Sequence, residues 1–380
     1  MTELALNKPQ AKASKKKLAL ESLEIKNFRP FQNLRIEKLG RVNLIVGKNS
    51  VGKSSVLEAL QLYANQGSLS TIIEVLEGRN EYSARRTRTV ARAEISENLA
   101  SSVKYLFFGR NNLNDLPAPI QIGTINESNS VLIITISWYA EQTDEEGGRK
   151  LQPINPEDYG DINDRVLGLA INFGKQPQRI FRLNRDYRFP NGIEGNHLPS
   201  IFIPTGGLSN EDLGKLWNII TLTPLEDDVT KGMQIIEPQA ERVAVLTDSS
   251  ASIVVKIQGN NRVPLQSLGD GMRRIFGIIL ALVNSQDGFL LVDEIENGLH
   301  YSVQLDLWRI IFEVARRLNV QVFATTHNWD CIEAFQKAAS EDQQSEGMLI
   351  RLQHRRDKLV TTLYDEHDLA IATKQEIEVR

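Results

Sequence analysis

The chain has 380 residues, a formal net charge of -4 and a single cysteine, Cys331. Its length predicts two or three domain-sized units, or one large domain with insertions. The net charge excludes a nucleic-acid-binding surface that is basic over most of the protein, and the single cysteine excludes an internal disulfide and a cysteine-rich zinc site. No apolar run approaches the ~18 residues of a membrane span, and the first residues lack the apolar core of a signal peptide. We therefore expect a cytoplasmic protein.

Runs rich in β-branched and aromatic residues predict strands along the whole chain. They cover residues 18–28, 34–39, 42–46, 131–139, 178–189, 200–204, 242–246, 252–257, 289–292, 321–325, 348–353 and 359–364. Apolar residues at helical spacing predict helices between them. These cover residues 54–60, 71–76, 209–220, 226–237, 271–284, 301–318 and a segment ending near 339, followed by a short helix in the tail. The acidic stretch of residues 141–165 is expected to be a loop.

The expected fold class is α/β, because helices and strands alternate after residue 271 and this alternation favours a parallel sheet. Residues 242–257 add an antiparallel pair of strands. We expect four segments along the chain. They are a disordered basic tail at residues 1–18, an N-terminal lobe at 19–65, an insertion or helical subdomain at 66–240 and a C-terminal lobe at 241–380.

The most specific motif follows the strand at residues 42–46. Residues 47–54 read G-K-N-S-V-G-K-S and fit the phosphate-binding P-loop, G-x-x-x-x-G-K-[ST]. Its glycines let backbone N–H groups point at phosphate oxygens, and the helix N-terminus adds positive partial charge. Lys53 is expected to reach the β- and γ-phosphates of ATP, and the Ser54 hydroxyl to hold Mg²⁺. The expected nucleotide-binding residues here are Gly47, Lys48, Asn49, Ser50, Val51, Gly52, Lys53, Ser54 and Ser55.

Further polar residues stand where buried strands end or a helix begins. Asp293 and Glu294 follow the strand at 289–292, at the edge where open α/β sheets bind ligands. Asp293 suits a carboxylate linked to Mg²⁺, and Glu294 suits a base that deprotonates the attacking water. His327 follows the strand at 321–325 and is in position to sense a γ-phosphate. Residues 267–271 read S-L-G-D-G before a helix, an S-x-G-x-G pattern that is typical either of an anion-binding nest or of a simple loop-to-helix turn.

In this order the motifs resemble the heads of ABC-class ATPases of the RecF, SMC and OLD group. The finer similarity is to OLD-like AAA-type ATPases, and it rests on residues 23–29 (L-E-I-K-N-F-R), 269–271, 293–300 and 325–327. The resemblance covers both ends of the chain, whereas residues 65–200 match loosely. It implies an ABC-class P-loop NTPase head with an antiparallel β subdomain and an α/β insertion between the P-loop and the S-x-G-x-G signature.

The resemblance also implies that two heads pair head to tail, as a homodimer or a higher homo-oligomer. Each ATP would lie between the P-loop of one subunit and the signature of the other, where Ser267, Gly269 and Gly271 reach the γ-phosphate. Glu294 is then the base, and Lys53 and His327 are the other catalytic residues. The remaining residues placed near the nucleotide by this resemblance are Asn27, Arg29 and Asn297.

The chain departs from these relatives in several respects. The signature reads S-L-G-D-G rather than the transporter-like S-G-G, and the Q-loop glutamine has two candidates, Gln61 and Gln142. Sustained heptads of a long coiled coil are absent. After His327 the chain has 380 − 327 = 53 residues, too few for a Toprim nuclease domain. The acidic run at residues 157–161 lies in a proline-containing segment and favours a solvated loop over a nuclease metal site.

We therefore expect an ATPase subunit of a two-component anti-phage defence system such as PARIS. ATP-dependent dimerisation would make it a sensor and scaffold that controls a separately encoded, Toprim-like nuclease. One alternative is a RecF-like DNA-binding repair ATPase. Its best basic patch is Arg85, Arg86, Arg88 and Arg92, although this run favours a solvated arginine helix. The other is a nucleotide switch that binds only a protein partner. Since no Asn-Lys-x-Asp guanine reader occurs, ATP is favoured over GTP.

Overall fold

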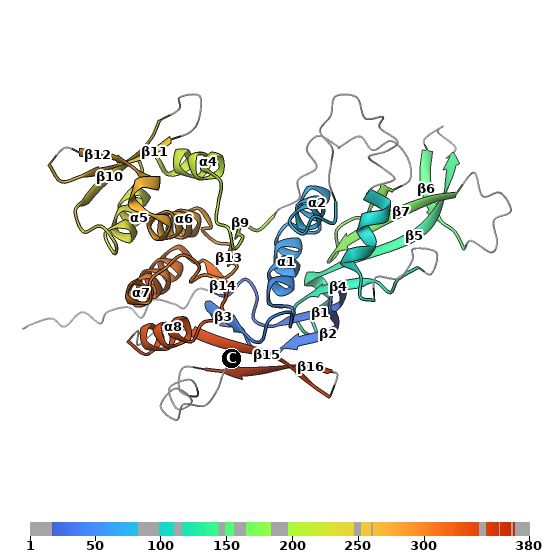
Figure 1. Cartoon of the computed structure of the whole chain (residues 1–380). Coiled ribbons are helices and arrows are strands. Elements are labelled where there is room, and N and C mark those ends of the chain that lie inside the picture. Colours follow the sequence, from blue (N-terminus) through green and yellow to red (C-terminus); the bar gives the residue numbers. More distant parts are fainter. Residues whose placement is uncertain are drawn as a thin grey trace, which may run out of the picture.

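The computed structural model describes residues 17–82, 99–109, 116–143, 149–155, 165–183, 197–246, 252–259, 261–341, 347–356, 358–365 and 368. Within these ranges the strands form three sheets (Figure 1). A six-stranded sheet lies in the middle of the molecule, between a large antiparallel sheet and a lobe with a small three-stranded sheet. The predictions for the N-terminal tail, the arginine patch at residues 85–92 and the acidic run at 157–161 fall outside the described residues, apart from the tail's last two positions.

The central sheet carries the strands that precede the P-loop, Asp293 and His327. Its order is β16 (Lys358–Tyr364), β15 (Gly347–Arg355), β3 (Val42–Val46), β14 (Gln321–Thr325), β13 (Phe289–Val292) and β9 (Ser200–Ile203). All neighbours pair in parallel except β16, which is antiparallel to β15. Successive side chains alternate between the two faces. Leu290 of β13 therefore packs in one hydrophobic core, and Leu291 in the other.

Helices cover both faces of this sheet, which is why β3, β13 and β14 are buried along their whole length. On one face lie α6 (Asp270–Asn284), α7 (Tyr301–Leu318) and α8 (Trp329–Glu341). On the other lie α1 (Lys53–Ala64) and α2 (Leu69–Glu77), beside the large antiparallel sheet (Figure 1). No helix among the described residues is long and apolar enough to span a membrane.

The antiparallel sheet joins strands from the start of the chain to strands that follow the P-loop helix. Its order is β2 (Phe31–Ile36), β1 (Leu23–Phe28), β4 (Ile120–Gly123), β5 (Val131–Thr143), β7 (Arg165–Phe173) and β8 (Arg179–Arg182), with β6 (Arg149–Pro153) paired to β5. The opposite lobe combines α4 (Asn210–Ile220) and α5 (Leu225–Met233) with β10 (Ala240–Leu246), β11 (Ser252–Ile257) and β12 (Asn261–Pro264).

The α/β class with an antiparallel β subdomain is confirmed. The helix predicted to begin after Ser209 does so, because the Ser209 hydroxyl accepts a hydrogen bond from the Asp212 N–H. The predicted loop at 141–165 is wrong in its first half, since β5 runs to residue 143 and β6 pairs with it. β6 forms because it pairs with the long strand β5, although its own sequence has few apolar residues. The strand expected at 34–39 runs instead from residue 31 to 36, and the helix expected to reach 237 ends at 233.

Candidate nucleotide-binding and catalytic site

The P-loop follows β3 and leads directly into α1. Gly52 is the N-cap of α1 at φ 106°, and no side chain caps the helix. A Cβ at Gly52 would lie 2.8 Å from ring atoms of Phe31, and one at Gly47 would lie 2.5 Å from the backbone oxygen of Leu352. Both positions therefore require glycine. The first N–H groups of α1 have no side-chain acceptor, which suits them to bind a phosphate.

Lys53 lies over this loop. Its Nζ donates to the backbone oxygens of Gly47 at 2.8 Å and Lys48 at 3.3 Å. Burial lowers the pKa of the Lys53 ammonium, and the nearby carboxylates of Asp293, Glu294 and Glu296 act in the opposite direction. The cation is thus held between a backbone loop and an acidic sheet edge. Of the other loop residues, Lys48, Asn49 and Ser50 are exposed, whereas Val51 is buried.

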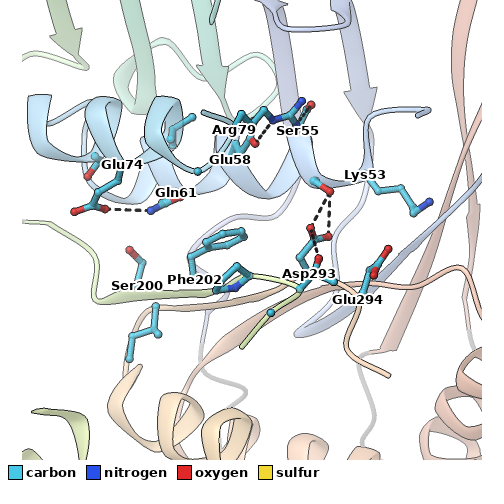
Figure 2. A pocket seen from close by; sticks show the side chains of 18 of the residues that line it. Lys53, Ser55, Glu58, Gln61, Glu74, Arg79, Ser200, Phe202, Asp293 and Glu294 are labelled. Carbon is cyan, nitrogen blue, oxygen red and sulfur yellow. Dashed lines mark hydrogen bonds and ion pairs between the residues drawn. The ribbon is translucent and has the colours of Figure 1, made fainter. Parts of the chain in front are cut away.

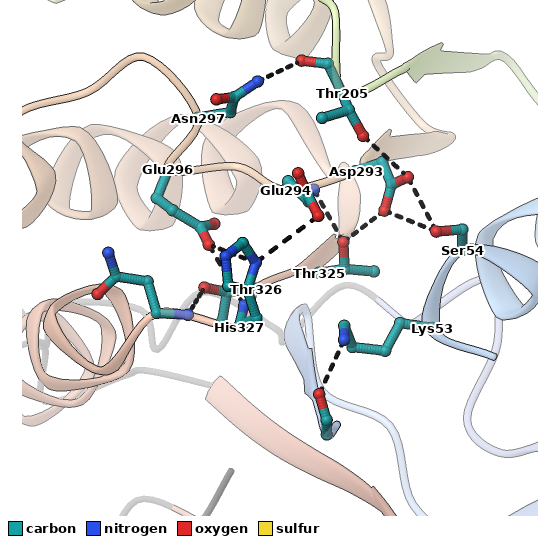
Figure 3. A network of polar contacts seen from close by, with 12 residues as sticks. Lys53, Ser54, Thr205, Asp293, Glu294, Glu296, Asn297, Thr325, Thr326 and His327 are labelled. Carbon is teal, nitrogen blue, oxygen red and sulfur yellow. Dashed lines mark hydrogen bonds and ion pairs between the residues drawn. The ribbon is translucent and has the colours of Figure 1, made fainter. Parts of the chain in front are cut away.

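Three hydroxyl groups surround the Asp293 carboxylate (Figure 3). The Ser54 hydroxyl donates to its Oδ2 at 2.9 Å and its Oδ1 at 3.1 Å. Thr325 donates to Oδ1 at 2.6 Å, and Thr205 to Oδ2 at 3.2 Å. These residues come from α1, β14 and the segment after β9, so the fold gathers them from distant parts of the chain.

The donor set around Asp293 fits Mg²⁺ bound together with nucleotide phosphates. Mg²⁺ prefers oxygen ligands and usually takes only one or two carboxylates, completing its shell with water and phosphate. Ser54 and Asp293 supply such oxygens. Among the described residues, no group of three or more His, Cys, Asp or Glu side chains could hold a metal by itself. A cation here would therefore depend on the nucleotide.

Glu294 has an unusual backbone conformation that its neighbours hold in place. Its φ is 46°, in the left-handed region that non-glycine residues rarely adopt. Its N–H donates to the Thr325 hydroxyl at 2.8 Å. Arg274 of α6 donates from Nη2 to the backbone oxygens of Asp293 at 2.7 Å and Glu294 at 2.9 Å. A buried arginine and a buried threonine thus stabilise the turn that presents the Glu294 carboxylate.

His327 lies between two carboxylates (Figure 3). Its Nδ1 is 3.6 Å from Glu294 Oε1 and 3.4 Å from Glu296 Oε1. The backbone N–H of His327 also donates to Glu296 Oε1 at 3.3 Å. The His327 side chain is 53% exposed and that of Glu296 only 7%. Glu296 is therefore a buried anchor for the histidine, which faces the open side of the site.

The S-x-G-x-G residues lie at the N-terminus of α6. Ser267 and Gly269 are exposed, and Gly269 is the N-cap of the helix at φ 89°. Gly271 packs close to the segment after Asp293, since a Cβ there would lie 3.0 Å from the backbone oxygen of Gly298. Asn297, in that segment, donates from Nδ2 to the Thr205 backbone oxygen at 2.9 Å. Ser267, Gly269 and Gly271 do not line the groove that contains the P-loop of their own chain.

That groove has a volume of about 1320 Å³ and lies between α1 and α2 on one side and β9 and α4 on the other. Lys53, Asp293 and Glu294 lie at one end, and Glu74 and Ser200 at the other (Figure 2). The two Q-loop candidates are not near Asp293. Gln61 lies on the α1 side of the groove, where its Nε2 is 3.4 Å from Glu74, and Gln142 is exposed on β5.

The structure does not bring the side chains of Asn27 and Arg29 to the P-loop. Asn27 donates from Nδ2 to the Pro119 backbone oxygen at 3.0 Å. Arg29 is buried and paired with Glu58 at 2.5 Å and Glu81 at 2.9 Å. The segment that carries them supports the loop in another way, through the contact of Phe31 with Gly52 described above.

Glu58 connects this buried charge cluster to α1. Burial raises the pKa of its carboxyl group, against the opposing effect of Arg29 and Arg79. Arg79 donates to Glu58 at 2.6 Å and to the Ser55 hydroxyl at 2.9 Å (Figure 2). The Ser55 side chain is therefore buried against the cluster. This arrangement fixes the first turns of α1 from behind.

The sequence reasoning gave no role to three residues of the site, Thr205, Arg274 and Thr325. It placed Glu296 only in residues 296–299, the D-loop that the resemblance implies, and did not foresee its contact with His327. Thr325 and Glu296 adjoin predicted site residues and had a local signal. Thr205 comes shortly after the strand β9 and precedes two glycines, so it too stands at the carboxyl end of a strand of the parallel sheet. Arg274 had no comparable signal, since its partners are backbone oxygens.

The chain is similar to several known proteins. The family model described as "AAA domain, putative AbiEii toxin, Type IV TA system" matches residues 42–330. The chain is 26% identical over 348 residues to an ATP/GTP phosphatase of Helicobacter pylori, an alignment that covers 85% of this chain and 89% of the relative. It is 39% identical over 54 residues, 14% of this chain and 15% of the relative, to the DNA replication and repair protein RecF of Clostridioides difficile.

Solved structures of SMC heads are also similar. The SMC head bound to the C-terminal winged-helix domain of ScpA has 13% sequence identity and a TM-score of 0.48, with 91% of this chain and 98% of that chain covered. An SMC head domain from Thermotoga maritima has 12% identity and a TM-score of 0.42, with 91% and 99% covered.

Proposed function

The chain belongs to this AAA-domain family, and we propose that it is a magnesium-dependent ATPase of the ABC class that works as a pair of heads. The contact of the P-loop hydroxyl of Ser54 with Asp293 carries this proposal, because it brings a phosphate loop and a strand-end carboxylate to one point. Glu294 and His327 lie at the same sheet edge. The similarity to an ATP/GTP phosphatase over most of the chain supports hydrolysis of the nucleotide.

In the proposed reaction the P-loop N–H groups and Lys53 bind the phosphates, and Ser54 and Asp293 hold Mg²⁺. The bound cation would neutralise charge that develops on the β- and γ-phosphates. Glu294 accepts a proton from the attacking water. His327, fixed by Glu296, orients the γ-phosphate from the open side of the site.

The position of the signature supports the proposed pairing of two heads. Ser267 and Gly269 are exposed at the N-terminus of α6, away from the P-loop groove of their own chain. A helix N-terminus attracts an anion through its free N–H groups and its dipole. A second copy of the chain, turned head to tail, would supply these residues to the γ-phosphate. The nucleotide then holds the two heads together.

For the biological role, we propose that the nucleotide state of this pair controls a separately encoded effector, a nuclease of a defence or toxin–antitoxin system. The toxin–antitoxin description of the family supports this role. The short similarity to RecF favours a second candidate, a DNA-binding maintenance ATPase. Pull-down of the tagged protein with and without ATP separates them. Capture of a nuclease supports the first, and ATP-dependent DNA retention without a protein partner supports the second.

Phosphate release tests the enzymatic proposal. The purified protein is expected to hydrolyse ATP when Mg²⁺ is present, and Glu294→Gln to bind ATP while losing about 10²- to 10⁴-fold in turnover. Full turnover by Glu294→Gln would remove Glu294 from the role of base. Parallel assays with ATP and GTP compare the two nucleotides, and we expect ATP to be preferred.

A further inference from the structure

The segment after β9 meets the magnesium-site carboxylate. β9 pairs in parallel with β13, and Ile203 lies opposite Val292 in the register. Both strands therefore end at the same edge, and Thr205 emerges beside Asp293. The Thr205 hydroxyl donates to Asp293 Oδ2 at 3.2 Å (Figure 3). Thr205 is thus joined to the site through β9, the neighbour of the strand that precedes Asp293.

We propose that Thr205 is a further residue of the magnesium site, and that residues 204–208, the coupling loop, connect that site to the signature helix α6. The inference rests on the proposed function and extends it to a residue that the sequence analysis did not assign to the site.

The chemistry of the hydroxyl fits this role. A threonine hydroxyl has one donor and two acceptor lone pairs. While it donates to Asp293, its oxygen keeps acceptor capacity for the hydration shell that Mg²⁺ retains in such sites. Valine has nearly the same shape but lacks this oxygen. A change of threonine to valine therefore removes the contact and little else.

The backbone of the coupling loop is held by donors from α6 and from the segment after Asp293. Arg274 Nη1 donates to the Pro204 oxygen at 3.0 Å, and Arg273 Nη2 to the Leu208 oxygen at 2.7 Å. Asn297 adds the bond to the Thr205 oxygen described above. The loop is thereby attached to α6 at both of its ends.

The loop also has room to move. It borders a cavity of about 300 Å³ against α6, and a Cβ built on Gly206 would meet no atom within 4 Å. Arg274 lies four positions after Asp270, the first residue of α6, so it shares this helix with Gly271, the last residue of the signature. A shift of Thr205 toward a bound cation would pull on Arg274 and so change the position of the signature. Magnesium binding in one chain thus adjusts the surface offered to the other.

The test compares Thr205→Val with Thr205→Ser, which keeps the hydroxyl. Binding of a fluorescent N-methylanthraniloyl ATP is titrated with Mg²⁺ and repeated in EDTA. The wild type and Thr205→Ser should respond at the same Mg²⁺ concentration, and Thr205→Val should need about tenfold more. Binding in EDTA should be equal in all three. Thr205→Ala removes the hydroxyl without putting a methyl group in its place, and it should behave like Thr205→Val.

Hydrogen exchange gives the second readout. In the wild type, Mg²⁺ and ATP together should change amide protection in residues 266–274, and in Thr205→Val this change should be lost while protection in α1 remains. Equal magnesium midpoints in Thr205→Val and the wild type would overturn the inference alone. A wild-type protein whose nucleotide binding ignores Mg²⁺ would overturn the proposed function as well.

Discussion

Replacement of Arg274 by lysine removes the planar guanidinium that holds the Glu294 turn and keeps the positive charge. The Arg274 side chain donates to the backbone oxygens of Pro204, Asp293 and Glu294 at 3.0, 2.7 and 2.9 Å. It is only 7% exposed, so water cannot replace these donors. A lysine ammonium is a point donor and cannot reproduce the fork.

The size of the effect follows from the bonds that are lost. A hydrogen bond from a charged donor contributes about 1.5–3 kcal/mol. A lysine at this position should keep a hydrogen bond to part of this set of three backbone oxygens. It should lose at least one of the bonds to the oxygens of Asp293 and Glu294. Because 1.36 kcal/mol corresponds to a factor of ten in rate, loss of one such bond lowers turnover about 10- to 100-fold. The left-handed φ of Glu294 then has one restraint fewer.

Steady-state phosphate release, ATP affinity and thermal melting are measured on Arg274→Lys. We expect turnover to fall by this factor, with ATP affinity within about threefold of wild type, because the P-loop is untouched. Arg273→Lys is the matched control, since Arg273 makes one bond to the same loop and none to Glu294. Wild-type turnover in Arg274→Lys, or an equal loss in Arg273→Lys, would refute the reasoning.

One glycine substitution should abolish ATP binding, and another should stabilise the fold. Gly52→Ala places a Cβ 2.8 Å from Phe31 and should abolish ATP binding, whereas Gly277→Ala, inside α6 with its nearest contact at 3.6 Å, should raise the melting temperature. A Gly52→Ala protein that binds ATP normally would contradict the first expectation. Cys331 is buried and its pKa is raised by desolvation, so it should react with a thiol reagent only on unfolding. Rapid labelling of the native protein would contradict the burial.

The sequence predicted those parts of the fold and site that depend on local pattern. The strands at 289–292 and 321–325 and the helix at 301–318 lie where apolar runs and helical spacing put them. Asp293 was identified because a buried strand directly precedes it. Each of these inferences uses residues that are adjacent along the chain.

The rest depends on contacts between distant segments. Thr205 meets Asp293 across 88 positions, and only the parallel pairing of β9 with β13 brings them together. The strand β6 forms because β5 is there to pair with it. Arg29 lies in a segment next to the P-loop, yet its charge is satisfied by Glu58 and Glu81, which motif similarity does not reveal. Arg274 binds backbone oxygens, which carry no sequence signal.

A mixing experiment tests the claim of a site shared by two chains. Lys53→Ala removes the P-loop cation, and Ser267→Arg blocks the signature, so each variant alone should be inactive. In a mixed pair the intact P-loop of one chain meets the intact signature of the other. An equal mixture should therefore recover about a quarter of wild-type phosphate release, because half of the pairs are mixed and each has one complete site. Full activity of Ser267→Arg alone, or no recovery on mixing, would contradict the shared site.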